Sequence, residues 1–113
     1  MLKRIISGAF IAAACLGTSA SSAGTMLASW YGPYFHGRLT ANGETYDMHG
    51  ITAAHKTLPF NTKLRVCYEG CVDLRINDRG PYIGGRELDL SYGAAAQIGL
   101  FDVGVDYTEV TYI

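Results

Sequence analysis

Short stretches of alternating polar and apolar residues, separated by glycine, constrain the fold of this chain most strongly. Lys63–Val66 and Val72–Ile76 both alternate, which leaves one face of a β-strand dry and the other wet. The closing segment, Tyr107–Ile113, is rich in β-branched and aromatic residues, which also favours a strand. With 14 glycines and a single plausible helix, the chain is expected to form a closed β-barrel with tight turns, because closure removes exposed edges.

Two cysteines flank the loop between the alternating strands. Cys67 and Cys71 enclose Tyr68-Glu69-Gly70, in which Gly70 stands where a hairpin turn would need a positive φ. Residues at the ends of such a loop face each other at ~4.5–5.5 Å between Cα atoms, within disulfide reach. In an oxidising compartment we expect Cys67 and Cys71 to form a disulfide, which is favoured over catalytic or metal-binding thiols.

One short helix is expected near the end of the chain. Ser91 can cap it, Ala94-Ala95-Ala96 favours it, and Gly99 can end it. Ala95 and Ile98 would share its buried face. The sequence shows no internal repeat, charge run or linker, so we expect one domain.

The first residues have the three-part pattern of a secretory signal peptide. Two positive charges, Lys3 and Arg4, precede the apolar run Ile5–Gly17, and the small residues of Thr18–Ala23 follow. The run is shorter than the ~20 residues that cross a bilayer. We therefore predict a signal peptide over residues 1–23 and a mature domain over residues 24–113, exported to the periplasm or the cell exterior.

Lipid anchorage through Cys15 is the alternative for this segment. Cys15 follows Ala12-Ala13-Ala14 and loosely resembles a lipoprotein processing site, but the usual leucine three places earlier is missing. Plain cleavage after Ala23 is therefore favoured over a membrane-anchored lipoprotein.

Charge argues against nucleic acid as a partner. The chain has 9 basic and 10 acidic residues, and cleavage would remove two of the basic ones. The mature domain would be mildly acidic, whereas nucleic-acid binding needs a basic face. An uncharged polymer such as a glycan fits this surface better, and we expect a monomer.

The residues that could do chemistry stand in turns. Glu44, His55 and Asp78 are the candidates, although each also has a structural explanation; Asn77-Asp78 could form an Asx turn. The chain lacks the Gly-x-Ser-x-Gly, Walker, His-Glu-x-x-His and paired Cys-x-x-Cys motifs. Its histidines, including His36 and His49, are spaced irregularly, so a metal site is not favoured and no cofactor is expected.

Five ordered blocks nevertheless form a specific pattern from about Met26 to Ile113. These blocks closely resemble the rare lipoprotein A (RlpA) family: Ala28–Gly32, Phe35–Glu44, Thr52–Pro59, Arg75–Pro81 and Asp89–Ser91.

The resemblance implies a fold and an activity. The fold would be all-β, a six-stranded double-psi β-barrel with one short helix. The activity would be that of a lytic transglycosylase that cleaves the MurNAc–GlcNAc bond of peptidoglycan, prefers strands lacking stem peptides and leaves 1,6-anhydroMurNAc ends. The family's acidic pair would be Glu44 and Asp78, with His55 beside them.

A mechanism follows from this assignment. Asp78 would protonate the glycosidic oxygen and then, as a carboxylate, take the proton of the C6 hydroxyl that closes the anhydro ring. Glu44 would stabilise the developing positive charge or share the acid/base role, and His55 would bind substrate or orient a carboxylate.

Substrate contacts are assigned to residues in or beside the same blocks. Trp30, Tyr31 and Tyr34 could stack on sugar rings, although Trp30 could equally belong to the core, and His36 lies in the same region. Arg79 could contact the lactyl carboxylate of muramic acid or pair with Asp78.

Two functions of other classes stay open at this point. Because the same barrel occurs in expansins and barwin-like proteins, fold alone does not establish catalysis. The first alternative is a non-catalytic module that binds cell-wall polysaccharide, and the second is a secreted factor that binds a protein partner.

Overall fold

The barrel is closed and its six strands come from the whole length of the described chain. The structure is a computed structural model that describes residues 21–32 and 35–113. The predicted signal peptide up to Ala20, with Cys15, and the predicted sugar contact Tyr34 lie outside these residues. The elements are β2 (Ser21–Trp30), β3 (Thr52–His55), β4 (Lys63–Cys67), β5 (Cys71–Asp78), β6 (Leu88–Leu90), α1 (Tyr92–Ile98) and β7 (Asp106–Tyr112).

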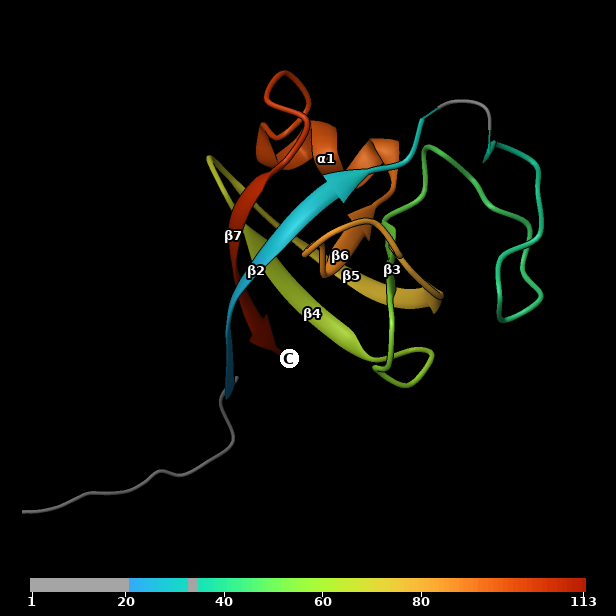
Figure 1. Cartoon of the computed structure of the whole chain (residues 1–113), viewed down its shortest axis with the longest axis horizontal. Coiled ribbons are helices and arrows are strands. Elements are labelled where there is room, and N and C mark those ends of the chain that lie inside the picture. Colours follow the sequence, from blue (N-terminus) through green and yellow to red (C-terminus); the bar gives the residue numbers. More distant parts are fainter. Residues whose placement is uncertain (1–20, 33–34) are drawn as a thin grey trace, which may run out of the picture.

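The strands follow the order β2-β6-β3-β5-β4-β7 around the barrel (Figure 1). Two pairs, β2 with β6 and β3 with β5, are parallel, and the other four are antiparallel. A long loop between β2 and β3 extends from one side of the barrel, next to the end of β5 (Figure 1). The expected six-stranded barrel with one short helix is confirmed for the described residues.

The alternating strands form the predicted hairpin. In β4 and β5 the residues of one face are buried in the core, whereas Lys63, Arg65 and Asp73 are exposed. The core is filled mainly by leucine, isoleucine and valine: Leu64, Val66, Leu74, Ile76, Leu88, Leu90, Ile98, Leu100 and Val110.

The helix begins and ends where the sequence predicted. Ser91 lies at its N-cap, where the Ser91 hydroxyl accepts a hydrogen bond from the Ala94 N–H. Gly99 ends the helix in the left-handed conformation at φ 81°. Ala95 and Ile98 are buried as expected.

The hairpin disulfide is present, but the role expected for Gly70 was wrong. Cys67 and Cys71 are bonded, with their Cα atoms 4.0 Å apart, closer than the spacing expected from the pairing alone. Gly70 is not among the residues with positive φ. A Cβ at Gly70 would instead lie 3.0 Å from the Gln97 carbonyl oxygen. Glycine is favoured here because the loop packs closely against the end of α1, where the Ile98 carbonyl accepts the N–H groups of Glu69 and Gly70.

The first strand begins earlier than expected. The sequence suggested strands from Met26 onward, whereas β2 begins at Ser21 and pairs with β7 as far as Tyr112. Ala23, the predicted cleavage point, therefore lies inside β2. Cleavage there would remove the pairing of Ser21 and Ser22 with β7.

Removing the disulfide should weaken the fold without changing it. A loop this short gives a modest entropic stabilisation, so the Cys67→Ser/Cys71→Ser variant should lose ~2 kcal/mol of unfolding free energy. Urea unfolding of the oxidised protein beside the variant measures this loss. Coincident unfolding curves would contradict the prediction.

Candidate active site

A small hollow on the surface of the barrel is lined by two carboxyl groups, those of Asp78 and Asp89. It has a volume of about 150 Å³, and its lining residues are Tyr31, Phe35, Asp78, Arg79 and Asp89. We call it the Asp78 hollow. The residues come from three places that are distant in sequence: the end of β2 and the loop after it, the end of β5, and β6.

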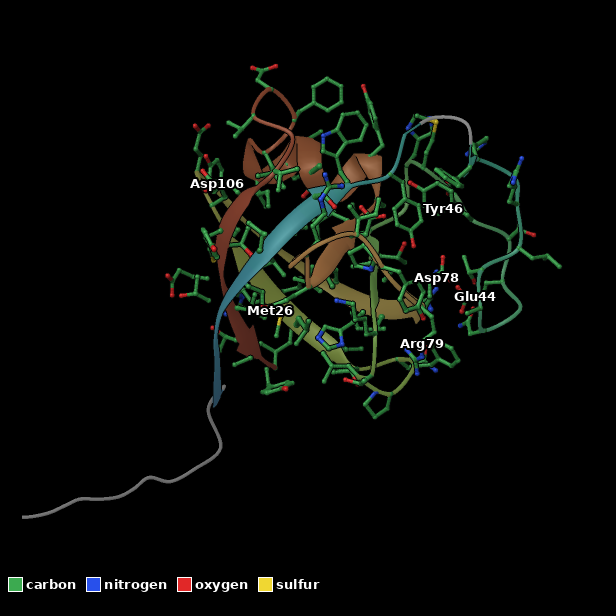
Figure 2. The ribbon with its side chains drawn as sticks, in the orientation of Figure 1. Met26, Glu44, Tyr46, Asp78, Arg79 and Asp106 are labelled. Carbon is green, nitrogen blue, oxygen red and sulfur yellow. A yellow bond between two sulfur atoms is a disulfide. The ribbon has the colours of Figure 1, made fainter. Side chains whose placement is uncertain are left out.

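A bulge in β5 directs Asp78 toward this hollow. Ala53 of β3 pairs with Ile76, but the next residue, Ala54, pairs with Asp78, so that β5 supplies an extra residue, Asn77. A bulge of this kind breaks the alternation of the strand and changes the direction of a side chain. Asp78 is half-buried and lies at the strand end, beside the long loop (Figure 2).

The Asp78 carboxyl group accepts three hydrogen bonds. The Tyr31 hydroxyl donates to Oδ2 at 2.8 Å. The backbone N–H of Ala41 donates to Oδ1 at 2.8 Å, and that of Arg79 donates to the same oxygen at 2.9 Å. The side chain is therefore fixed from β2, from the long loop and from its own strand end.

Tyr31 supports Asp78 rather than offering a surface for sugar stacking. Its ring is buried and packs against Tyr46 at 4.8 Å between centroids. Burial, together with the hydrogen bond to Asp78, raises the pKa of the Tyr31 hydroxyl. Tyr31 thus stays protonated and donates to Asp78 at any physiological pH.

Asp89 is a second carboxyl group in the Asp78 hollow. The Ser29 hydroxyl donates to its Oδ1 at 3.0 Å. Burial raises the pKa of Asp89 to about 6, and the nearby Asp78 contributes in the same direction. The Ser29 hydrogen bond and Arg86 lower it, but they do not offset the burial. Asp89 thus keeps its proton to a much higher pH than an ordinary aspartate does.

Glu44 lies at the same edge of the barrel as Asp78 (Figure 2), but it lines a different hollow. Arg75 binds both of its carboxylate oxygens, at 2.7 and 2.8 Å. Asn42 and Asn77 also donate to it, and these contacts, led by Arg75, lower the pKa of Glu44 to about 2. Glu44 is therefore an ionised, fully engaged carboxylate.

This cluster fastens the long loop onto β5. The Asn42 side chain, which donates to Glu44, also accepts hydrogen bonds from the Thr40 hydroxyl and from the Glu44 N–H. The Asn42 backbone N–H donates to the Asn77 carbonyl at 3.3 Å. The loop so held contains Ala41, whose N–H reaches Asp78.

His55 contacts Arg79, the residue that follows Asp78: the His55 backbone carbonyl accepts a hydrogen bond from the Arg79 guanidinium at 3.3 Å. The Nδ1 atom of His55 accepts the N–H groups of Thr57 and Leu58, both at 3.1 Å. Burial, with help from Arg79 and Lys56, lowers the pKa of His55, so the ring is neutral near pH 7.

The Arg79 guanidinium is directed to the turn that His55 organises. It donates to the Leu58 carbonyl at 2.9 Å and lies 4.0 Å from the centre of the Phe60 ring. No ion pair between Arg79 and Asp78 is recorded among the described side chains; the Arg79 backbone N–H makes the contact instead.

The remaining predicted contacts lie outside the Asp78 hollow. Trp30 stacks on Phe101 at 4.5 Å and packs edge-on against Tyr92, so it belongs to an aromatic cluster over α1. His36 is exposed, and its Nδ1 accepts the Met48 N–H at 3.1 Å.

The structure adds three residues that sequence reasoning missed. Asp89 was part of a family-like block, Asp89–Ser91, but was not assigned a role. Phe35 lines the Asp78 hollow and is 48% exposed, and Tyr82 is 75% exposed just after β5. Phe35 begins one quoted block and Tyr82 directly follows another, so their aromatic side chains were the signal available.

Within residues 21–32 and 35–113, no group of three or more His, Cys, Asp or Glu side chains is placed to hold a metal ion. No helix in the same part is long and apolar enough to span a bilayer.

The buried acid should lower stability at neutral pH. Since the pKa of Asp89 is raised from 3.8 to about 6, the folded protein holds a proton that the unfolded chain releases, and stability falls as pH rises through this window. Asp89→Asn should therefore raise the unfolding free energy at pH 7.5 by ~1–3 kcal/mol and abolish the decline between about pH 4 and 6. Urea titrations across this pH range measure both effects; a variant less stable than wild type at pH 7.5 would refute them.

Comparisons with known proteins agree with this architecture. The family model described as lytic transglycolase, a double-psi β-barrel domain, matches residues 23–112. A solved structure, the Streptomyces papain inhibitor, superposes with a TM-score of 0.61 over 78% of this chain and 90% of its own, at 22% identity. The inhibitor supports the fold alone.

Curated relatives carry one description. The endolytic peptidoglycan transglycosylase RlpA of Campylobacter jejuni is 54% identical over 81 residues, 69% of this chain and 30% of the relative. That of Pseudomonas aeruginosa is 50% identical over 86 residues, 74% of this chain and 25% of the relative. A probable endolytic RlpA of Synechocystis is 56% identical over 82 residues, 70% of this chain and 26% of the relative.

The matched region thus spans about a quarter to a third of these relatives' length. The double-psi β-barrel expected from the sequence is confirmed by the family match over nearly all the described residues. This chain belongs to the RlpA-like lytic transglycolase family.

Proposed function

We propose that this chain is a peptidoglycan lytic transglycosylase. It cleaves the MurNAc–GlcNAc bond within glycan strands, preferring strands without stem peptides, and leaves 1,6-anhydroMurNAc ends. Relatives described as endolytic peptidoglycan transglycosylases support this proposal. The observation that carries it is the half-buried Asp78 carboxyl group, fixed by three hydrogen bonds at a hollow open to solvent.

The reaction requires two proton transfers. The bridging oxygen must gain a proton as its bond to C1 breaks, because a sugar alkoxide is a poor leaving group. The C6 hydroxyl of the same muramic acid must lose a proton as it attacks C1. Water is not consumed, so the carboxylate-separation rule for hydrolases does not apply directly.

Asp78 is the group that takes part in these transfers. Its three hydrogen bonds fix the carboxyl group at the hollow, where it is positioned to receive the C6 hydroxyl proton. Either Asp78 also supplies the first proton, or a second carboxyl group does.

We assign Glu44 a positioning role in this proposal. Its carboxylate is taken up by Arg75, Asn42 and Asn77, and a pKa of about 2 leaves it no proton to donate. By holding the loop that carries Ala41, Glu44 acts on Asp78 through that loop.

His55 is likewise assigned a positioning role toward Asp78. It holds the turn at Thr57 and Leu58, and the Leu58 carbonyl binds the Arg79 side chain. The backbone of Arg79 in turn donates to Asp78. Phe35, exposed at the edge of the Asp78 hollow, is the aromatic ring best placed to stack on a sugar.

The proposal extends to the cell envelope as the site of action. Peptidoglycan lies outside the cytoplasmic membrane, which agrees with the signal peptide expected over residues 1–23. Cleavage after Ala23 is favoured over lipidation of Cys15.

Digestion of denuded glycan strands by the purified domain tests the activity. Mass spectrometry should detect new 1,6-anhydroMurNAc ends, and Asp78→Asn should lower their rate of formation by ~10²–10⁴-fold while the fold is retained. Reducing ends would indicate hydrolysis instead. Binding to the strands without any new ends would identify a wall-binding module and refute the proposal.

Replacing Glu44 should be milder than replacing Asp78. Glu44→Gln weakens the pair with Arg75 and loosens the loop, so we expect a loss in kcat of about tenfold, below that of a lost proton-transfer group. The pair is half-exposed, so stability should fall by no more than ~1 kcal/mol. Rates of anhydro-end formation and urea unfolding measure these effects. A loss in rate as large as that of Asp78→Asn would assign Glu44 a direct part in the chemistry.

A further inference from the structure

Four neighbouring strands place two carboxyl groups in one row. Asp89 of β6 pairs with Ser29 of β2 on one side and with Ala54 of β3 on the other. Ala54 pairs in turn with Asp78 of β5. Residues paired across a sheet project on the same face, so Asp78 and Asp89 flank Ala54 on a common face.

The small side chain of Ala54 lies between the two acids and is buried beneath Tyr31 and Tyr46. Two strand spacings separate the Cα atoms of Asp78 and Asp89 by ~9–10 Å. Both carboxyl groups nevertheless line the Asp78 hollow, together with Tyr31. A sugar–sugar linkage that enters this hollow therefore meets both acids.

The two carboxyl groups have different surroundings. Asp78 accepts three hydrogen bonds, whereas Asp89 accepts a single one recorded in the described chain, from Ser29 at 3.0 Å. The second oxygen of Asp89 is thus available to a ligand.

The charged and titratable groups around Asp89 come from each element packed against it. Arg86 precedes β6, Asp78 ends β5, Tyr31 follows β2, and Tyr46 lies in the long loop. Both tyrosines stay neutral, since burial raises the pKa of each. The balance of these groups and of burial leaves the pKa of Asp89 at about 6.

We propose that Asp89 is the general acid of the reaction and that Asp78 is its base. This inference rests on the proposed function. It assigns the two proton transfers to two residues, where a single carboxyl group could otherwise perform both.

In the proposed step one bond to C1 breaks while another forms, and two protons move. The C1–O bond breaks with its electron pair on the bridging oxygen, which receives the proton of the Asp89 carboxylic acid. The C6 hydroxyl oxygen forms the new bond to C1, and its proton goes to the Asp78 carboxylate. Asp89 ends ionised and Asp78 protonated, and exchange with solvent restores both. Nothing is oxidised or reduced.

The pH dependence of glycan cleavage tests this assignment. Rates of anhydro-end formation from denuded strands are measured between pH 4.5 and 8 for wild type, Asp89→Asn, Asp78→Asn and Asp102→Asn. The last is the matched control, the same change at an exposed carboxyl in the turn after α1.

We expect the wild-type rate to fall above about pH 6, as Asp89 loses its proton. Asp89→Asn should lower the rate by ~10²–10⁴-fold and remove this fall, whereas Asp102→Asn should behave as wild type. The assignment of Asp89 would be overturned if wild type is active, the rate of Asp89→Asn lies within about threefold of the wild-type rate, and both rates decrease alike above about pH 6. The proposed function would then still stand. A wild type that makes no anhydro ends would overturn both.

A titration without substrate tests the pairing independently. Side-chain carboxyl ¹³C shifts should show Asp89 titrating near pH 6 in wild type and at lower pH in Asp78→Asn, because the like charge is removed. An unchanged Asp89 midpoint in Asp78→Asn would show that the two groups do not interact and would overturn the shared site.

Discussion

The position of β3 between β5 and β6 is the constraint on which the site depends. β3 pairs with both strands, one parallel and one antiparallel, and so brings the ends of two segments to either side of Ala54. The bulge in β5 then directs Asp78 onto the face that carries Asp89. In a simple hairpin meander these two acids would not lie on either side of one residue. They do so here because the parallel crossovers of the closed barrel place β3 between β5 and β6.

The surroundings of Asp78 fix its position, whereas those of Asp89 raise its pKa. Asp78 is held by Tyr31, by the loop that Glu44 fastens and by the strand end that Arg79 continues. Asp89 is half-buried, and its raised pKa implies a stability cost at neutral pH. A site that retains such a cost fits a role in proton transfer.

Local sequence patterns were enough to predict the strands and the helix, but not the tertiary contacts between them. Alternation gave the hairpin, and the cap residues Ser91 and Gly99 gave the helix. The early start of β2, the close approach of Gly70 to α1 and the burial of Tyr31 depend on partners distant in sequence, which no local signal reports. The same reason applies to Glu44, which the sequence suggested as a charge-stabilising or acid/base residue and whose pairing with Arg75, distant along the chain, no local signal reports. Asp78 could be found from the sequence, but its partner Asp89 required the strand register.

A crystal structure of Asp78→Asn with a bound glycan fragment would test the central claim most directly. The bridging oxygen of the MurNAc–GlcNAc linkage should lie within hydrogen-bond distance of the Asp89 carboxyl group, with the C6 hydroxyl beside residue 78. A fragment bound along the hollow that Glu44 lines, with Asp89 out of reach of the linkage, would contradict it.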